Sequence, residues 1–446
     1  MACTPRAQDA QEWGSHLTRK LSNRILQRSD LQPKSLKTSH KLALIGALYV
    51  SQGLPFGFFT QALPVLLRQS GLSLTQIGFS SLLALPWALK FLWAPMVDRN
   101  YSARFGQRRS WIIPAQLCIA IVLAWSAALS PANDMTQIFV VVALCNLFAA
   151  TLDIATDALA VRLLNASERG IGNGIQVAGY RIGMVISGGL LLIVFEQLGW
   201  ALSFLFMSGL VLLLTIPILL YREPIPGVKA PSTRWSWSYF KQAGVMPWLG
   251  AILFYKLGDA LGAGMIKPFM VDGGMTLTEI GWLIGTVGFA ANLVGALLGG
   301  ALTSRYGHYR CMIAFGMLQV LGIVGYVALA SGHLPKPTLY AIVTFENVAG
   351  GMVTAAIFTM MMDACRKGSE GTDYTIQSCV FIIATGIATV FSGWLAQTFG
   401  YVSYFGLSAV TAFIALTPFA LAAFGKGFLA LQLNQLEVSD HVASSR

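Results

Sequence analysis

The sequence has little charge for its length. Asp, Glu, Lys and Arg together make up 11% of its 446 residues, whereas a soluble domain carries about 25%. Hydrophobic residues make up 55%, with almost none of the polar linkers that divide soluble chains of this length into domains. This composition excludes a soluble enzyme, a disordered protein and a nucleic-acid-binding domain. It indicates a protein whose main solvent is the lipid bilayer.

Short motifs of catalysis and of metal and nucleotide binding are absent from the sequence. It contains no C-x-x-C, H-E-x-x-H or G-x-S-x-G, and its six cysteines are scattered. We therefore expect no disulfide framework, metal site or cofactor. The sequence also lacks the phosphate-binding pattern G-x-x-x-x-G-K-[ST], so nothing indicates ATP hydrolysis. A membrane protein without ATP hydrolysis can still do work by drawing on a gradient of an ion or solute.

Long apolar runs predict twelve transmembrane helices. Each run supplies the roughly 20 apolar residues that a helix needs to cross a bilayer. The predicted spans are 42–66, 74–95, 111–130, 137–160, 171–194, 201–221, 247–270, 278–301, 311–331, 338–361, 375–398 and 402–424.

The positive charges predict how these spans are oriented. With both termini on one side, 24 of the 30 Lys and Arg residues lie on that side, and only Arg68 and Lys336 lie in loops on the other. Lys and Arg concentrate in cytoplasmic loops. We therefore expect both termini in the cytoplasm and lipid as a partner. The bias also explains the pI near 9.5 without nucleic acid.

An internal repeat predicts two related halves. Three matches occur in order at offsets of 201 to 203 residues: Leu74–Gly78 with Leu277–Gly281, Gln176 with Gln377, and Gly199 with Gly400. Two six-helix halves in parallel repeat are typical of the major facilitator superfamily. We therefore expect an all-α membrane protein with the major facilitator fold.

The repeat also sets the predicted domain boundaries. A cytoplasmic tail covers 1–40, and an N-terminal six-helix bundle covers 41–221. A cytoplasmic linker rich in Pro and basic residues covers 222–246. The C-terminal six-helix bundle covers 247–424, and a second cytoplasmic tail covers 425–446.

Charged residues between spans 2 and 3 resemble a loop motif of that superfamily, G-x-x-x-D-R-x-G-R-R. The loop contains Asp98, Arg99, Arg108 and Arg109, and a weaker copy with Arg305 lies between spans 8 and 9. These residues are predicted to gate transport as a charge latch at the cytoplasmic helix ends. The alternative is a solvated, positively charged loop.

Further motifs resemble one branch of the superfamily. K-F-L-W-A-P-M-V-D-R at 90–99, G-Q-R-R-S-W at 106–111 and L-D-I-A-T-D-A at 152–158 resemble segments of the muropeptide permease (AmpG) and acetyl-CoA transporter group. The stretch 51–64 looks more like the related siderophore importers of the RhtX/FptX type, which also have twelve spans. The resemblance implies an importer of the bacterial inner membrane.

Charges inside the predicted spans mark candidate sites, because a charged side chain at the bilayer centre costs about 2.5–3.5 kcal/mol. Asp153 and Asp157 lie four apart on one face of span 4, and Arg181 lies near the middle of span 5. An Asp–Arg pair between these helices is expected to hold them together, to bind substrate, or both. Lys90 is expected to reach the inner membrane surface.

The C-terminal half contributes further candidates. Lys256, a predicted substrate ligand, and Asp259 lie three apart on span 7, where they can neutralise each other. Glu346 stands alone in span 10. Glu346, Asp153 and Asp259 are the predicted proton carriers. The alternative for Glu346 is a helix–helix hydrogen bond.

Span 1 supplies the remaining predicted ligands. Gln52, Phe56, Thr60 and Gln61 lie in a Pro- and Gly-containing helix that can present them to a cavity. Aromatic residues in such a helix serve either to pack or to contact a ligand. The spans contain few Asn, Gln and His residues, which favours a compact ligand with few polar groups.

These observations predict a monomeric secondary transporter that imports a small-molecule substrate. The favoured function is proton-coupled import of a siderophore, or its iron complex, from periplasm to cytoplasm by alternating access. The alternative is an anhydromuropeptide permease for cell-wall recycling. A polytopic membrane enzyme or sensor is the rival from another class, and the two-half repeat disfavours it.

Overall fold

The computed structural model describes residues 37–63, 83, 85–102, 104–130, 133–224, 237–242, 244–335 and 337–423. Contacts between residues divide the chain into two units after His40. The part from Lys41 onwards forms one compact unit. The described residues of this unit form helices and no strand, with one isolated bridge between Ser102 and Gly106. The predicted all-α class is confirmed.

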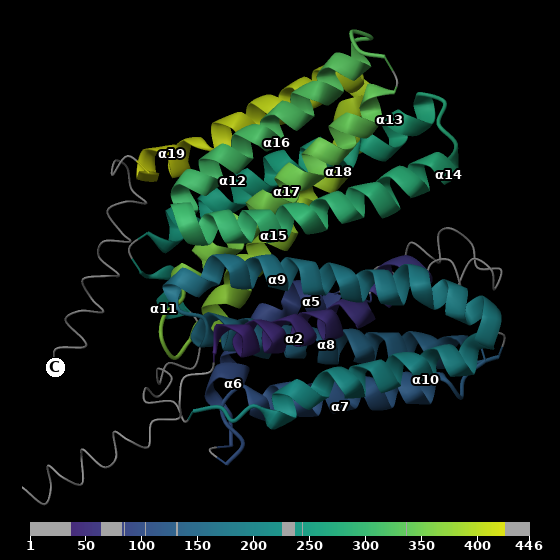
Figure 1. Cartoon of the computed structure of the whole chain (residues 1–446), viewed down its shortest axis with the longest axis vertical. Helices are drawn as coiled ribbons and strands as arrows, with labels where there is room; N and C mark the ends of the chain where they lie inside the picture. Colours follow the sequence, from purple (N-terminus) through teal and green to yellow (C-terminus); the bar gives the residue numbers. More distant parts are fainter. Residues whose placement is uncertain are drawn as a thin grey trace, which may run out of the picture. The chain divides into compact units, whose positions relative to one another are not determined.

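Helices of the N-terminal half run in the order of the predicted spans (Figure 1). Their bounds are α2 (Thr38–Gly57), η1 (Phe58–Ala62), α5 (Leu85–Leu89), η3 (Lys90–Leu92), α6 (Ala94–Arg99), α7 (Arg109–Ser126), α8 (Met135–Leu163), α9 (Ala166–Val185), η4 (Ile186–Leu190) and α10 (Leu191–Leu220). Residues 74–82 and 84 of predicted span 2 lie outside the described residues.

The C-terminal half follows the same pattern. Its bounds are α11 (Trp237–Phe240), α12 (Val245–Gly264), α13 (Ile266–Asp272), α14 (Leu277–Ile280), η5 (Gly281–Gly288), α15 (Phe289–Tyr306), α16 (His308–Ala330), α17 (Thr338–Asp363), α18 (Glu370–Ala415) and α19 (Thr417–Ala423). Predicted spans 11 and 12 correspond to α18 and α19, and α18 is interrupted at Gly400, between the two spans.

Among the described residues, nine helical segments are long and apolar enough to cross a membrane. Many of their large hydrophobic side chains are exposed, including Leu220 and Val390, which are 78% and 75% exposed. Such side chains are favourable on the outside of a helix bundle only where lipid surrounds it. α9 is helical as predicted but is more polar than these segments, since it carries Arg169 and Arg181.

The internal repeat is visible in the backbone. Gly199 interrupts α10 at φ 75°, and Gly400 interrupts α18 at φ 74°. Positive φ favours glycine, because it has no Cβ. The two glycines paired in the sequence therefore break their helices in the same way, which supports the predicted repeat.

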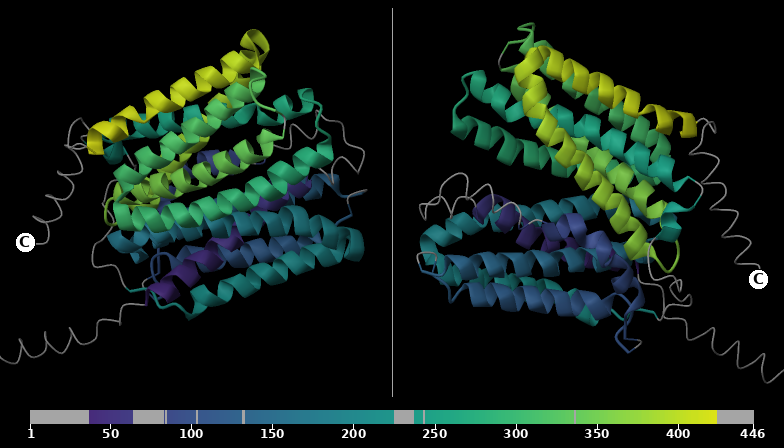
Figure 2. Two further views of the ribbon diagram at one scale, coloured as in Figure 1. Left: turned by 45° about the horizontal axis from the view of Figure 1, so that its top comes forward. Right: turned by 180° about the vertical axis from the view of Figure 1, so that it is seen from behind.

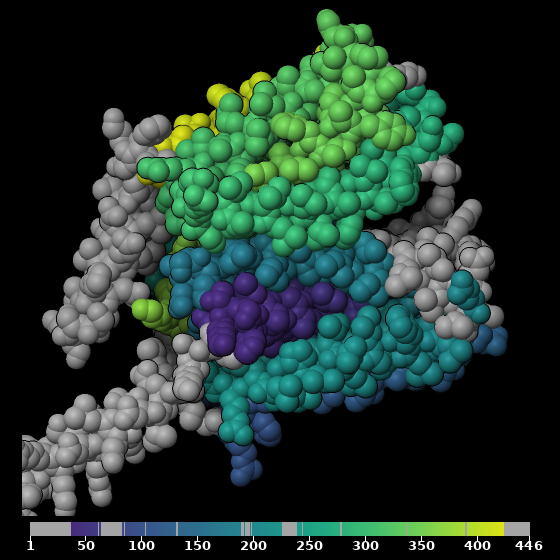
Figure 3. Space-filling model, viewed as in Figure 1, coloured from purple at the N-terminus to yellow at the C-terminus, as the bar shows by residue number. Residues whose placement is uncertain are grey.

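Close packing in the N-terminal half fixes α2 against α9. A Cβ added at Gly183 would lie 2.8 Å from Cα of Gly53, so only small residues allow the two backbones to approach this closely. In Figure 3, α2 (purple) lies between α9 and α10 on the visible face. Pro55 lacks an N–H group, and α2 passes into the π-helix η1 three residues later.

Candidate functional site

The two halves meet along α9 and α15, which lie side by side in Figures 1 and 2. The backbone N–H of Ile171 donates to Oγ of Ser304 at 2.9 Å. Arg169 forms an ion pair with Asp363, whose other oxygen lies 3.1 Å from Nδ1 of His308. By the predicted orientation, these contacts lie at the cytoplasmic ends of the helices.

Small residues allow this seam to close. A Cβ added at Gly174 would lie 2.7 Å from the carbonyl oxygen of Ala296, and one at Gly300 would lie 2.9 Å from Cα of Gly174. The backbones of α9 and α15 are therefore in direct contact, and a larger side chain at either glycine would separate the halves.

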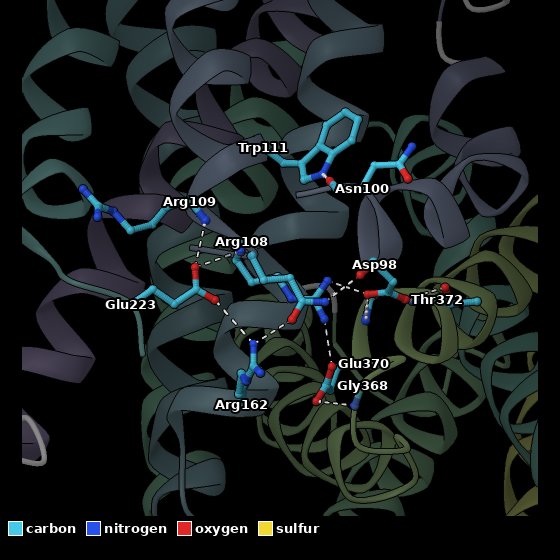
Figure 4. Close-up of polar contacts among 12 residues, drawn as sticks. Asp98, Asn100, Arg108, Arg109, Trp111, Arg162, Glu223, Gly368, Glu370 and Thr372 are labelled. Carbon is cyan, nitrogen blue, oxygen red and sulfur yellow. Dashed lines mark hydrogen bonds and ion pairs between the residues drawn. The ribbon is translucent and has the colours of Figure 1, made fainter. Parts of the chain in front are cut away.

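A second contact between the halves, the Asp98 latch, centres on a buried carboxylate at the end of α6 (Figure 4). Asp98 accepts hydrogen bonds from the guanidinium of Arg108 and from the backbone N–H groups of Gly371 at 3.2 Å and Thr372 at 2.7 Å. Arg108 also donates to Glu370 at 2.8 Å. A residue of the N-terminal half thus caps the first turn of α18 in the C-terminal half.

The latch compensates each of its charges. Arg108 is fully buried and Asp98 is 2% exposed. Burial opposes the charge on Arg108, but the carboxylates of Asp98 and Glu370 outweigh this effect and raise the pKa of Arg108 above its ordinary value. The N–H groups at the start of α18 add further positive potential beside Asp98.

The latch also depends on the end of α10. Glu223 accepts hydrogen bonds from the backbone N–H groups of Arg108 at 2.8 Å and Arg109 at 3.1 Å (Figure 4). The guanidinium of Arg109 donates to the carbonyls of Ile218 at 3.1 Å and Leu219 at 3.0 Å. In this state the side chain of Arg109 binds the end of α10 in its own half, and its predicted gating role stays a prediction.

The gating roles of Arg99 and Arg305 stay predictions. Arg99 is exposed at the end of α6. Arg305 is exposed and stacks near the ring of Tyr306 at 5.5 Å, while its neighbour Ser304 makes the contact with α9. The C-terminal partners Glu370 and Thr372 were missed. Acidic and Thr residues beside an apolar run indicate a helix start, but not what binds it.

A buried polar cluster lies between α2, α8 and the segment around η3. Lys90 forms an ion pair with Asp153, and their side chains are 3% and 11% exposed. The hydroxyl of Tyr49 donates to Asp157 at 2.6 Å. The predicted Asp153–Arg181 pair is wrong, and so is the placement of Lys90 at the surface. The turn of η3 directs Lys90 inward, toward α8.

Residues predicted on span 1 have different environments. Gln52 is fully buried, and neither atom of its amide has a hydrogen-bond partner. The ring of Phe56 packs against Trp87 at 5.4 Å and Tyr180 at 5.7 Å. Thr60 is exposed and donates to the carbonyl of Phe56 within its own helix. The side chain of Gln61 lies outside the described residues.

The C-terminal half contains a second polar cluster. Lys256 and Asp259 form the ion pair that their spacing predicts. Gln319 of α16 donates to Asp259 and accepts a hydrogen bond from Tyr255 at 2.6 Å. The ammonium of Lys256 also lies 4.5 Å from the ring centre of Phe381.

Glu346 belongs to the edge of this cluster rather than standing alone. It interacts with Gln319, and the charges of Asp259 and Lys256 act on it. Its hydrogen bond from Asn347 is long, at 3.4 Å. No three His, Cys, Asp or Glu side chains are grouped to hold a metal ion within the part of the chain that the structure describes.

Comparison with known proteins agrees with this architecture. The family model described as Major Facilitator Superfamily matches residues 248–429, and that described as Acetyl-coenzyme A transporter 1 matches residues 41–133. A solved structure of FucP in the outward conformation has a TM-score of 0.66 at 18% identity, covering 85% of this chain and 97% of its own. A bacterial homologue of the iron transporter ferroportin has a TM-score of 0.62 at 16% identity, covering 86% and 99%.

These matches and the fold define a multi-pass membrane transporter of the major facilitator superfamily, rather than an enzyme. The anhydromuropeptide permease of Escherichia coli (strain K12) is 32% identical over 387 residues, covering 83% of this chain and 77% of its own length. The chain belongs to the anhydromuropeptide permease family. The likeness to a ferroportin homologue shows the fold alone.

Because the Lys90–Asp153 ion pair is buried, we expect substitutions at these two residues to have strongly coupled effects on the free energy of unfolding. Replacing Lys90 by Met or Asp153 by Leu leaves the buried charge of the partner uncompensated, and each single change should destabilise the protein by about 3–5 kcal/mol. The Lys90→Met/Asp153→Leu double variant should lose less stability than the sum of single changes. Thermal unfolding of the purified protein in detergent measures this.

The Lys256–Asp259 pair is a matched control, since its side chains are 17% and 18% exposed. Corresponding changes there should couple more weakly. Purely additive effects at Lys90 and Asp153 would show that the ion pair does not stabilise the N-terminal half.

Proposed function

We propose that the chain imports anhydromuropeptides across the bacterial inner membrane by proton-coupled alternating access. The observation that carries this proposal is its 32% identity, over 83% of the chain, to the anhydromuropeptide permease of Escherichia coli. The prediction of a siderophore importer finds no support among these relatives. Its stated alternative, muropeptide import, is therefore the better reading.

The interior polarity supports a sugar-peptide substrate. The siderophore prediction depended on the small number of Asn, Gln and His residues in the spans. The fold concentrates polar groups from separate helices instead. Tyr49 and Asp157 meet Lys90 and Asp153 in one half, and a second cluster lies around Gln319 in the other. A substrate with many hydrogen-bonding groups suits such an interior.

The contacts between the halves indicate which end is closed in this state. The Asp98 latch and the α9–α15 seam join the halves at the end that the positive charges assign to the cytoplasm. A substrate would therefore reach the interior of this state from the opposite side. Opening toward the cytoplasm requires that Asp98 release the first turn of α18, and relative motion of packed helices of this kind is common in transporters.

Proton coupling is assigned to Glu346. Asp153 and Asp259, the other predicted carriers, each have a lysine partner. Within the described residues, Glu346 has no ion pair, and its contacts are with the amides of Gln319 and Asn347. Because a carboxylate without a cation is costly in the membrane interior, Glu346 is the group best placed to gain and lose a proton during the cycle.

Uptake by proteoliposomes tests the transported molecule. Labelled anhydromuropeptide should accumulate in vesicles that contain the chain when their interior is alkaline, and a protonophore should abolish the accumulation. A one-unit pH gradient supports about tenfold accumulation for one coupled proton. Empty vesicles are the control. Accumulation of a ferric siderophore without any anhydromuropeptide would return the assignment to siderophore import.

The coupling residue has a separate prediction. Glu346→Gln should lose accumulation driven by the pH gradient but retain exchange of labelled for unlabelled substrate, because an amide cannot carry the proton. Glu279→Gln is the matched control, since Glu279 is exposed and its carboxylate accepts hydrogen bonds from Thr276. Full gradient-driven accumulation by Glu346→Gln would exclude Glu346 as the sole carrier.

A further inference from the structure

Arg181 is a cation in the interior of the transporter that has no ion-pair partner among the described residues. It lies in the middle of α9 and is half-buried. No described residue forms a hydrogen bond or an ion pair with its guanidinium, although arginine offers five donors. An unpaired guanidinium inside a membrane protein is unfavourable, and such residues usually face a cavity or pathway.

The surrounding charges do not neutralise Arg181. Asp153 holds Lys90. Asp259 of the other half acts electrostatically on Arg181, but it forms its ion pair with Lys256. The two lysines in the described clusters are therefore already paired, and Arg181 is the cation that remains available to an incoming anion.

The position of Arg181 also suits a ligand. Arg181 lies two helical turns after Gly174, whose Cα approaches α15, so it lies on the face of α9 that is turned toward the C-terminal half. One residue earlier on α9, the ring of Tyr180 packs 5.7 Å from that of Phe56, which in turn contacts Trp87. A guanidinium can bind an anionic group, and these rings on α9 and α2 offer an apolar surface to another part of the same ligand.

We propose that Arg181 binds a carboxylate of the transported molecule. This rests on the proposed function. The planar guanidinium can hold both oxygens of a carboxylate at once. A carboxylate bound between Arg181 and the C-terminal cluster would also touch both halves. Its binding would therefore shift the equilibrium between the conformations in which the halves meet differently.

Equilibrium binding to the purified full-length protein tests this proposal. The probes are an anhydromuropeptide and the same molecule with every peptide carboxylate converted to a carboxamide. The wild type should bind the acid about 10- to 100-fold more tightly than the amide. Arg181→Gln should weaken binding of the acid by the same factor and leave the amide unaffected. Arg181→Lys should recover part of the preference.

The control variant is Lys267→Gln, which removes an exposed cation of α13 and should keep the full preference. The wild-type comparison of acid and amide needs no variant, so misfolding of Arg181→Gln cannot obscure the result. Equal binding of acid and amide by the wild type, or an undiminished preference in Arg181→Gln, overturns the role of Arg181 alone. If the wild type binds neither probe, the proposed function fails, and the role of Arg181 fails with it.

Discussion

The buried carboxylate of Asp98 is the interaction on which the arrangement of the two halves depends. A carboxylate that is 2% exposed needs compensation from charges and hydrogen-bond donors. One source is Arg108 in its own half, and the other is the first turn of α18 in the opposite half. The N-terminal half therefore cannot separate from α18 without leaving part of this charge uncompensated. Opening the halves at this end therefore costs free energy, because it removes part of the electrostatic compensation of Asp98.

The seam between α9 and α15 adds a second constraint of a different kind. Gly174 and Gly300 allow the backbones of α9 and α15 to come into contact. Because the contact is closely packed, separating the two helices would break it along its whole length. The ion pair of Arg169 with Asp363 lies at the end of the same seam. Charge and close packing therefore hold the same end of the molecule shut.

Much of this architecture could be predicted from the sequence. Long apolar runs give the spans because a bilayer imposes their length, and the pairing of Gly199 with Gly400 marks the repeat because both occupy positive φ. Asp98 and Arg108 could be identified because they lie in one loop. Their partner Glu370 lies 262 residues from Arg108, and local spacing carries no information about such a contact.

The interior pairs show the same limit. Lys256 and Asp259 were predictable as a pair, because residues three apart meet on one helix. The partner of Asp153 was not, since its choice between Lys90 and Arg181 depends on how neighbouring helices turn. The short η3 segment places Lys90 against Asp153, so that Asp153 does not pair with Arg181. A polar interior that seemed sparse by composition is therefore concentrated into clusters by the fold.

Distances between spin labels on the two halves test the role of the latch most directly. In a cysteine-free background, one pair replaces exposed Asn100 and Tyr306 at the latch end, and the other replaces exposed Thr136 and His333 at the opposite ends of their helices. With Asp98 intact, the latch-end distance should be short and narrowly distributed. Asp98→Asn should move it to longer values and shorten the opposite distance, whereas Asp134→Asn, in a loop away from the latch, should change neither. Unchanged distances at both ends in Asp98→Asn would contradict the account.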